Sequence, residues 1–160
     1  MMNLSYDVIA ALRGCTLATA ESCTGGKIGA ALTAIPGSSQ VYKGGVISYT
    51  NEIKTRQLDV ATDLLDREGA VSAPVAEAMA VGVREYFNTD IAVSVTGLAG
   101  PTGDEYGNPI GTVYIGYADD KKTFSRKYHF DGDREFVRTE AAKAALSLLL
   151  DQNTVSQSEK

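Results

Sequence analysis

Apolar positions along the chain follow two periodicities in turn, and this predicts helices interleaved with strands. Helical spacing of apolar residues predicts a first helix over residues 4–12 and another after a Ser-Ala-Pro start at residues 72–74. Near-continuous apolar runs at residues 16–20 and 91–95 are typical of buried central strands. The other expected elements are helices over 24–33, from 51, over 63–68 and after 132–133, and strands over 41–50, 111–118 and 123–130.

The order of these elements predicts the fold class. Helices between strands, with a hairpin-like pair near the end, favour a three-layer α/β/α fold with a mixed, mostly parallel sheet. We expect one domain over residues 1–152 and a disordered polar tail over residues 153–160. Ligand sites in such folds lie at the carboxyl ends of strands, among glycine-bearing loops.

Composition and charge narrow the class of protein. The chain has 160 residues, of which 44% are hydrophobic and 22% charged, which is typical of a soluble globular domain. The net charge of −5 argues against a nucleic-acid partner, because binding a phosphate backbone needs a basic face. No stretch is long enough to span a membrane and no signal peptide is present, so we expect a cytoplasmic protein without a membrane partner. Small α/β enzymes often associate, so we also expect a homo-oligomer.

The junction between the strand at residues 16–20 and the following helix carries the most specific candidate chemistry. Ser22 stands there, and the unpaired N–H groups of Thr24, Gly25 and Gly26 would lie near its hydroxyl. This pattern suits a nucleophile beside an oxyanion or phosphate cradle, although a capping serine followed by flexible glycines has the same sequence. The two cysteines form no CxxC pair and no His/Cys cluster exists, so no metal site is expected.

A serine nucleophile needs a base, and two residue types are candidates. The only histidine, His129, falls in the expected edge hairpin, where nothing favours a catalytic role. Lys54 lies one helical turn beyond a strand end that carries Tyr49, and a lysine in a dry cleft can act as a neutral amine. The alternatives are a solvated helix lysine and a tyrosine at the edge of the core.

A glycine-bearing loop after the strand at residues 91–95 is a second candidate for binding. Thr96, Gly97 and Gly100 offer a hydroxyl and backbone N–H groups that suit a phosphate or an oxyanion, although a simple turn reads the same way. The loop lacks the GxGxxG pattern and a Walker lysine, so no nucleoside triphosphate site is indicated. Arg134, at the expected start of the last helix, can pair with a phosphate or a carboxylate.

These motifs occur together in an order that resembles the CinA C-terminal domain family, the nicotinamide-nucleotide amidases. The resemblance covers residues 4–150, and its motifs lie at residues 20–26, 37–39, 45–54, 69–72, 94–101, 111–113 and 132–134. It implies an amidohydrolase that converts nicotinamide mononucleotide to nicotinate mononucleotide and ammonia, with no metal or organic cofactor. It also implies the stand-alone form of a domain that is often fused behind a larger one.

The resemblance also implies roles for individual residues. Ser22 matches the nucleophile, Lys54 the general base and Tyr49 an assisting hydroxyl. The substrate-binding set is Thr24, Gly25, Gly26, Thr96, Gly97, Gly100 and Arg134. The chain departs from the pattern at Asn108, where a lysine often precedes the proline, and this departure bears on substrate choice. Three readings stay open: the amidase, an amidase or esterase for another small substrate, and a non-catalytic nucleotide-binding or competence- and DNA-damage-associated partner protein.

Overall fold

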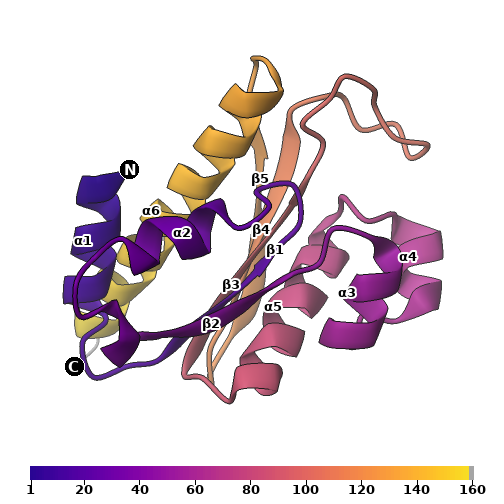
Figure 1. Cartoon of the computed structure of the whole chain (residues 1–160). Helices are drawn as coiled ribbons and strands as arrows, with labels where there is room; N and C mark the ends of the chain where they lie inside the picture. The colour runs from indigo at the N-terminus through magenta and orange to yellow at the C-terminus, as the bar shows by residue number, and fades with distance from the viewer. Residues whose placement is uncertain (159–160) are drawn as a thin grey trace.

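The computed structural model describes residues 1–158 and places a five-stranded sheet between two layers of helices (Figure 1). The three-layer α/β/α class is therefore confirmed. The elements in chain order are α1 (Met2–Ala11), β1 (Leu17–Glu21), α2 (Lys27–Thr33), the 3₁₀ turn η1 (Ser38–Gln40), β2 (Tyr42–Ile47), α3 (Asn51–Leu58), α4 (Thr62–Glu68), α5 (Ala73–Phe87), β3 (Ile91–Gly97), β4 (Thr112–Ala118), β5 (Thr123–His129) and α6 (Arg134–Ser158).

The sheet has the strand order β2-β1-β3-β4-β5. β1 pairs in parallel with β2 and β3, while β4 runs antiparallel to both β3 and β5. Four strands therefore point the same way and only β4 opposes them, as a mixed and mostly parallel sheet requires. The carboxyl ends of β1, β2 and β3 meet at one edge, and the candidate site lies at that edge.

The two faces of the sheet differ in side-chain size. Helices α1, α2 and α6 cover one face (Figure 1), where larger side chains such as Leu17, Val95 and Ile115 form the core. Helix α5 covers the other face, where the strands present small residues such as Ala18, Ala20 and Gly116. A Cβ on Gly116 would lie 2.2 Å from the Ala76 carbonyl oxygen, so the glycine permits this close approach.

Strand β2 is irregular at its two glycines, Gly44 and Gly45. Its register against β1 shifts between Leu17 and Ala18, so that Ala18 lies opposite Gly44. A Cβ on Gly45 would lie 2.3 Å from Thr19 Oγ1, which leaves no room for a side chain. The strand ends at Ile47, not at residue 50, and the chain then turns toward α3.

Two further boundaries differ from the sequence expectation. α2 begins at Lys27 and not at Thr24, because residues 22–26 form a turn with Gly25 and Gly26 at positive φ. α3 begins at Asn51, as expected, and its N-cap is Thr50, whose hydroxyl accepts the Ile53 N–H. α6 continues to Ser158, so residues 153–158 are helical where the sequence predicts a disordered tail. Residues 159–160 of that expected tail lie outside the described part. Extending an anchored helix is cheaper than nucleating one, which explains why this polar segment stays helical.

Candidate functional site

Ser22 is the first residue beyond β1 and is held at the carboxyl edge of the sheet. Its backbone N–H donates to the Val95 carbonyl of β3, so it continues the sheet pairing by one residue. Ser22 is 7% exposed to solvent, and its side chain lines a cleft at this edge of the sheet. The chain leaves the sheet here through a tight turn, so the hydroxyl stands at a strand-to-helix corner.

Lys54 reaches Ser22 from the opposite side of the cleft. It lies on α3, which begins directly after the Thr50 cap, and it is only 1% exposed. Its Nζ donates to Ser22 Oγ at 3.0 Å and to the Ser48 carbonyl oxygen at 2.8 Å. Burial lowers the pKa of Lys54 to about 8, and the neighbouring Cys23 opposes this shift. Lys54 has no carboxylate partner within residues 1–158, so desolvation dominates.

The cleft around this pair has a volume of about 320 Å³, at the lower end of the range of small-molecule sites. Ser22 and Lys54 both line it and are both buried. Apolar residues, including Val71 and Leu98, line the walls. The complete lining is Ser22, Cys23, Tyr49, Asn51, Lys54, Ala70, Val71, Thr96, Gly97, Leu98, Ala99, Gly100, Thr102 and Arg134. No acidic side chain belongs to this lining, although the chain as a whole carries a charge of −5.

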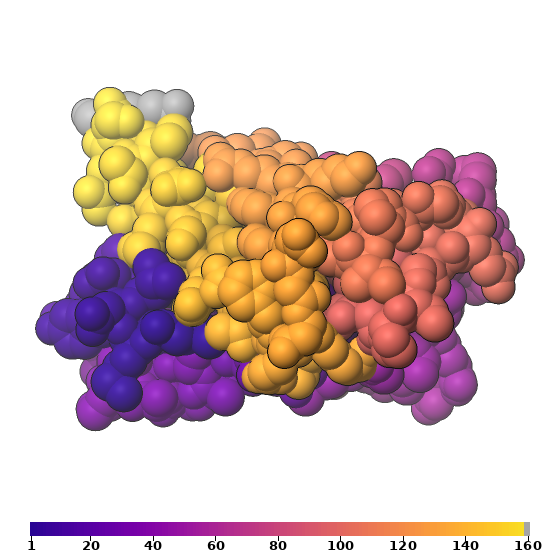
Figure 2. All heavy atoms as spheres, turned by 90° about the horizontal axis from the view of Figure 1, so that it is seen from above, coloured from indigo at the N-terminus to yellow at the C-terminus, as the bar shows by residue number. Residues whose placement is uncertain are grey.

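Tyr49 and Arg134 bridge the mouth of the cleft. Arg134 opens α6, and its guanidinium donates to the Tyr49 hydroxyl at 3.0 Å and to the Gly100 carbonyl at 2.5 Å. Tyr49 is 60% exposed, so its ring stands toward solvent. From above, the segment at the start of α6 lies beside the loop that follows β3 (Figure 2). The predicted residues Tyr49, Gly100 and Arg134 thus meet at one point.

The turn after Ser22 is arranged differently from the predicted cradle. Thr24, Gly25 and Gly26 do not line the cleft. The Gly25 N–H donates to the Ser22 carbonyl, and the Gly26 N–H donates to the Glu21 carboxylate. These donors are already satisfied, so they are not available to a ligand at the cleft. Within residues 1–158, the N–H groups of Cys23 and Thr24 in this turn make no hydrogen bond.

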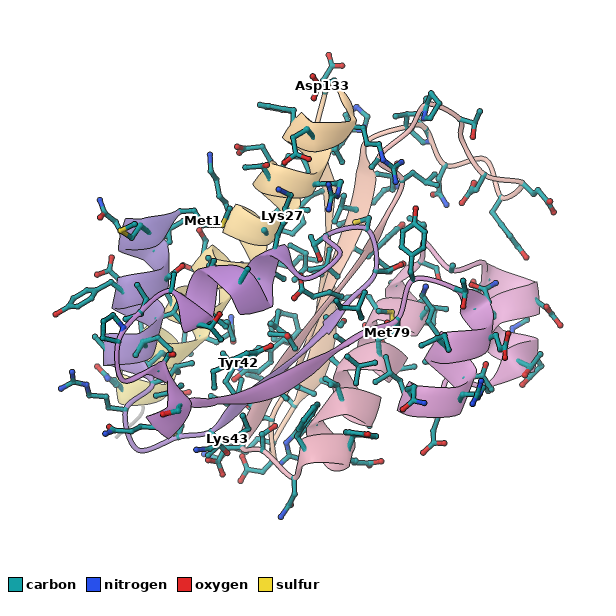
Figure 3. The ribbon with its side chains drawn as sticks, in the orientation of Figure 1. Met1, Lys27, Tyr42, Lys43, Met79 and Asp133 are labelled. Atoms are coloured by element: carbon teal, nitrogen blue, oxygen red, sulfur yellow. The ribbon has the colours of Figure 1, made fainter. Side chains whose placement is uncertain are left out.

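Arg138 covers the outer side of the same turn. Its guanidinium donates to the carbonyls of Cys23 and Thr24, and a Cβ on Gly25 would lie 3.1 Å from it. Arg138 also pairs with Glu135, which in turn pairs with Lys27 of α2. Figure 3 shows Lys27 beside α6. This network ties the turn to α6, and none of its side chains lines the cleft.

Of the other residues singled out from the sequence, some line the cleft and others lie outside it. Thr96 and Gly97 line the cleft, but the Thr96 hydroxyl is engaged by the Ala70 carbonyl at 2.7 Å. His129 is exposed on the edge strand β5, away from the cleft lining. Asn108 binds the Val71 carbonyl and the Asp104 carboxylate, so it holds the loop together and does not line the cleft.

Several residues in and around the cleft were not predicted from the sequence. The Ser48 carbonyl orients Lys54, yet a backbone acceptor leaves no trace in residue type. Val71 and Leu98 look like ordinary core residues in the sequence, and only the fold brings them to the cleft. Cys23 could have been found from its place next to Ser22. Burial raises the pKa of its thiol to about 11, so the thiol is neutral at physiological pH.

Neither a metal-ligand cluster nor a membrane-spanning helix is present in residues 1–158. Residues 1–158 contain no group of three or more His, Cys, Asp or Glu residues placed to hold a metal ion. In the same part of the chain, no helix has both the length and the apolar character that a membrane span requires.

The fold and the site together define a three-layer α/β protein with a buried serine–lysine pair at the carboxyl edge of its sheet. The chain belongs to the family described as the CinA C-terminal domain, whose model matches residues 3–153. This finding confirms the resemblance drawn from the motifs.

Relatives and solved structures agree with this assignment. A "CinA-like protein" of Geobacter sp. (strain M21) is 50% identical over 85% of this chain and 33% of its own length. A "putative competence-damage inducible protein" of Halothermothrix orenii is 49% identical over 86% of this chain and 33% of its own. The chain thus spans about a third of these relatives. The competence damage-inducible protein A (ComA) structure of Klebsiella pneumoniae subsp. pneumoniae MGH 78578 has a TM-score of 0.90 at 38% identity, covering 92% of this chain and 93% of that one.

Proposed function

We propose that this domain hydrolyses the carboxamide of nicotinamide mononucleotide to nicotinate mononucleotide and ammonia. The observation that carries the proposal is the buried contact of 3.0 Å between Ser22 Oγ and Lys54 Nζ. Burial lowers the pKa of this lysine to about 8, which makes a neutral amine accessible near physiological pH. The choice of substrate rests on the family resemblance and on the character of the cleft.

The surroundings of Lys54 fit a general base. A neutral amine has one lone pair and two hydrogens, and the Ser48 carbonyl can only accept, so one N–H points there. The lone pair can then face Ser22, and the 3.0 Å contact becomes a hydrogen bond from the Ser22 hydroxyl to Nζ. The Ser48 carbonyl thus orients the base toward the nucleophile.

The reaction divides into acylation and deacylation. Ser22 Oγ attacks the carboxamide carbon while its proton passes to Lys54, and the carbonyl oxygen becomes an oxyanion. When the C=O bond re-forms, the C–N bond breaks and Lys54 returns the proton to the nitrogen, which leaves as ammonia. Water then attacks the ester with its proton going to Lys54, the Oγ–C bond breaks, and Lys54 reprotonates Ser22 Oγ.

The N–H group of Cys23 is the donor best placed for the oxyanion. Cys23 lines the cleft and follows the nucleophile directly, as in a nucleophile elbow, and no group in residues 1–158 accepts from its N–H. The apolar walls around Val71 and Leu98 suit a pyridine ring, and Arg134 at the mouth suits a phosphate. Tyr49 holds that guanidinium through its hydroxyl.

Ammonia release from nicotinamide mononucleotide by the purified chain tests the proposal. We expect turnover by the wild type and by Lys43→Met, which removes an exposed lysine outside the cleft. Ser22→Ala and Lys54→Met should both lose turnover. Tight nucleotide binding without ammonia would favour the non-catalytic binding module. Turnover of another amide or ester alone would move the activity to a different small substrate.

A further inference from the structure

Glu21 is a buried carboxylate that the reaction described above does not use. It ends β1, directly before Ser22, and is 2% exposed. No lysine or arginine pairs with it in residues 1–158. Burying a carboxylate without a cation costs free energy unless hydrogen bonds satisfy its oxygens.

The partners of the Glu21 carboxylate are all backbone N–H groups of the α2 entrance. Oε1 accepts from Gly26 at 3.2 Å and from Ile28 at 3.0 Å, while Oε2 accepts from Gly29 at 3.0 Å. A carboxylate at the start of a helix also interacts favourably with the helix dipole. Gly29 has no side chain, and a Cβ there would lie 2.9 Å from the Tyr42 hydroxyl and 3.5 Å from Glu21 Oε2. Figure 3 shows Tyr42 between the sheet and α2.

The backbone of Glu21 connects this carboxylate to the base. Its carbonyl accepts the Ser48 N–H at 2.8 Å, and the Ser48 carbonyl in turn accepts from Lys54 Nζ. Its C-terminal neighbour is Ser22. One residue therefore joins the strand that carries the nucleophile, the strand end that orients the base, and the turn between them.

The carboxylate decides which N–H groups of the turn remain free. It takes the Gly26 donor, and the turn itself takes the Gly25 donor. Cys23 and Thr24 keep unpaired N–H groups directly after the nucleophile. If the carboxylate were absent, the entrance of α2 would have three unsatisfied donors, and the turn could rearrange to satisfy them.

We infer that Glu21 is a positioning residue whose carboxylate fixes the Ser22–Gly26 turn so that the N–H of Cys23, which lines the cleft, is the oxyanion donor. The inference rests on the proposed serine–lysine hydrolysis. Glu21 does not touch the substrate, and it acts through the turn. Its loss therefore weakens binding of the transition state more than binding of the substrate.

Two variants of Glu21 should lower kcat by different amounts. Glu21→Gln keeps one acceptor oxygen but turns an NH₂ group toward a backbone donor, and Glu21→Ala removes every acceptor. Loss of one oxyanion donor typically lowers kcat about 100-fold or more, so we expect about that loss for Glu21→Ala and about a tenfold loss for Glu21→Gln. KM should stay within about twofold for both variants, since the oxyanion exists only after attack. Equal kcat in the variants and the wild type would overturn the inference.

Ser94→Ala is the matched control. It removes a buried hydroxyl that donates to the Ala76 carbonyl, so it also costs stability, but it leaves the Ser22 turn intact. We expect unchanged kcat for this control. A fall in kcat for Ser94→Ala equal to that for Glu21→Gln would assign the Glu21 effect to general destabilisation and refute a positioning role.

Labelling by an alkyl fluorophosphonate separates this inference from the substrate assignment. Ser22 Oγ bonds to phosphorus, the P–F bond breaks with loss of fluoride, and the serine proton leaves through Lys54, with the phosphonyl oxygen in the oxyanion hole. If wild type labels but releases no ammonia, the substrate proposal fails while slower labelling of Glu21→Gln still supports the inference. Equal labelling rates overturn it. No labelling of the wild type refutes both.

Discussion

Replacing Lys54 with methionine should change the stability of the domain in a pH-dependent way. The lysine is almost fully buried without a carboxylate partner, and burial lowers its pKa from 10.5 to about 8. Methionine has a similar length and no charge. The substitution also removes the hydrogen bonds to Ser22 and the Ser48 carbonyl, but that loss does not depend on pH.

The sign and size of this pH-dependent stability difference follow from proton linkage. Between pH 8 and 10.5 the unfolded chain holds the Lys54 proton more tightly than the folded chain, so wild-type stability rises with pH in this window. Below pH 8 both states are protonated, and the penalty for burying the charge is fully present. From pKa values of 10.5 and about 8, the free energy of unfolding of wild type relative to Lys54→Met should rise by about 2.5 kcal/mol from pH 7 to pH 10.

Urea denaturation of both proteins at pH 7, 8.5 and 10 measures this difference. Other groups that titrate in this range, such as the tyrosines, are common to both proteins and cancel in the subtraction. Lys43→Met serves as the control, because its exposed lysine should give a pH-independent difference. A flat difference for Lys54→Met would refute the reasoning, since it would mean that burial does not destabilise the charged amine.

Three further predictions concern activity and packing. The kcat/KM of the wild type should rise about tenfold per pH unit below pH 8 and level off above it, because only neutral Lys54 accepts the Ser22 proton; a profile flat between pH 6 and 8 would contradict this. Tyr49→Phe, which removes the hydroxyl that accepts from Arg134, should lower kcat/KM for ammonia release about tenfold or more, and an unchanged value would exclude the hydroxyl from the site. Gly82→Ala should lower the free energy of unfolding by about 1–3 kcal/mol or more in urea titrations, because its Cβ would lie 2.0 Å from the Leu58 carbonyl oxygen; wild-type stability would show that α3 and α5 separate freely.

The fold was largely predictable because its elements carry strong local signals. The apolar run of β3 and the single apolar face of α5 identify both elements from the sequence. The end of α6 was not predictable from composition. Residues 153–158 are polar, but Gln152 just before them is buried, and the helix continues from that anchor.

The site was predictable where chemistry depends on residue type and not where it depends on backbone groups. Ser22 follows one strand end and Lys54 lies one helical turn beyond another, and the family resemblance is what singled out the two together. The fold brings them to hydrogen-bond distance. The glycines after Ser22 suggested a free cradle. The structure fills that cradle with the Glu21 carboxylate, a contact that depends on the path of the turn and not on any motif.

The filled cradle affects how an anionic substrate can bind. A free helix entrance beside Ser22 would attract a phosphate, but the Glu21 side chain already accepts from its N–H groups. The lining of the cleft contains no carboxylate, and its exposed cation is Arg134, which donates to the Gly100 carbonyl and the Tyr49 hydroxyl. The proposed function therefore assigns two tasks to separate groups. We propose the Cys23 N–H after Ser22 for the oxyanion and Arg134 of α6 for the phosphate of the substrate.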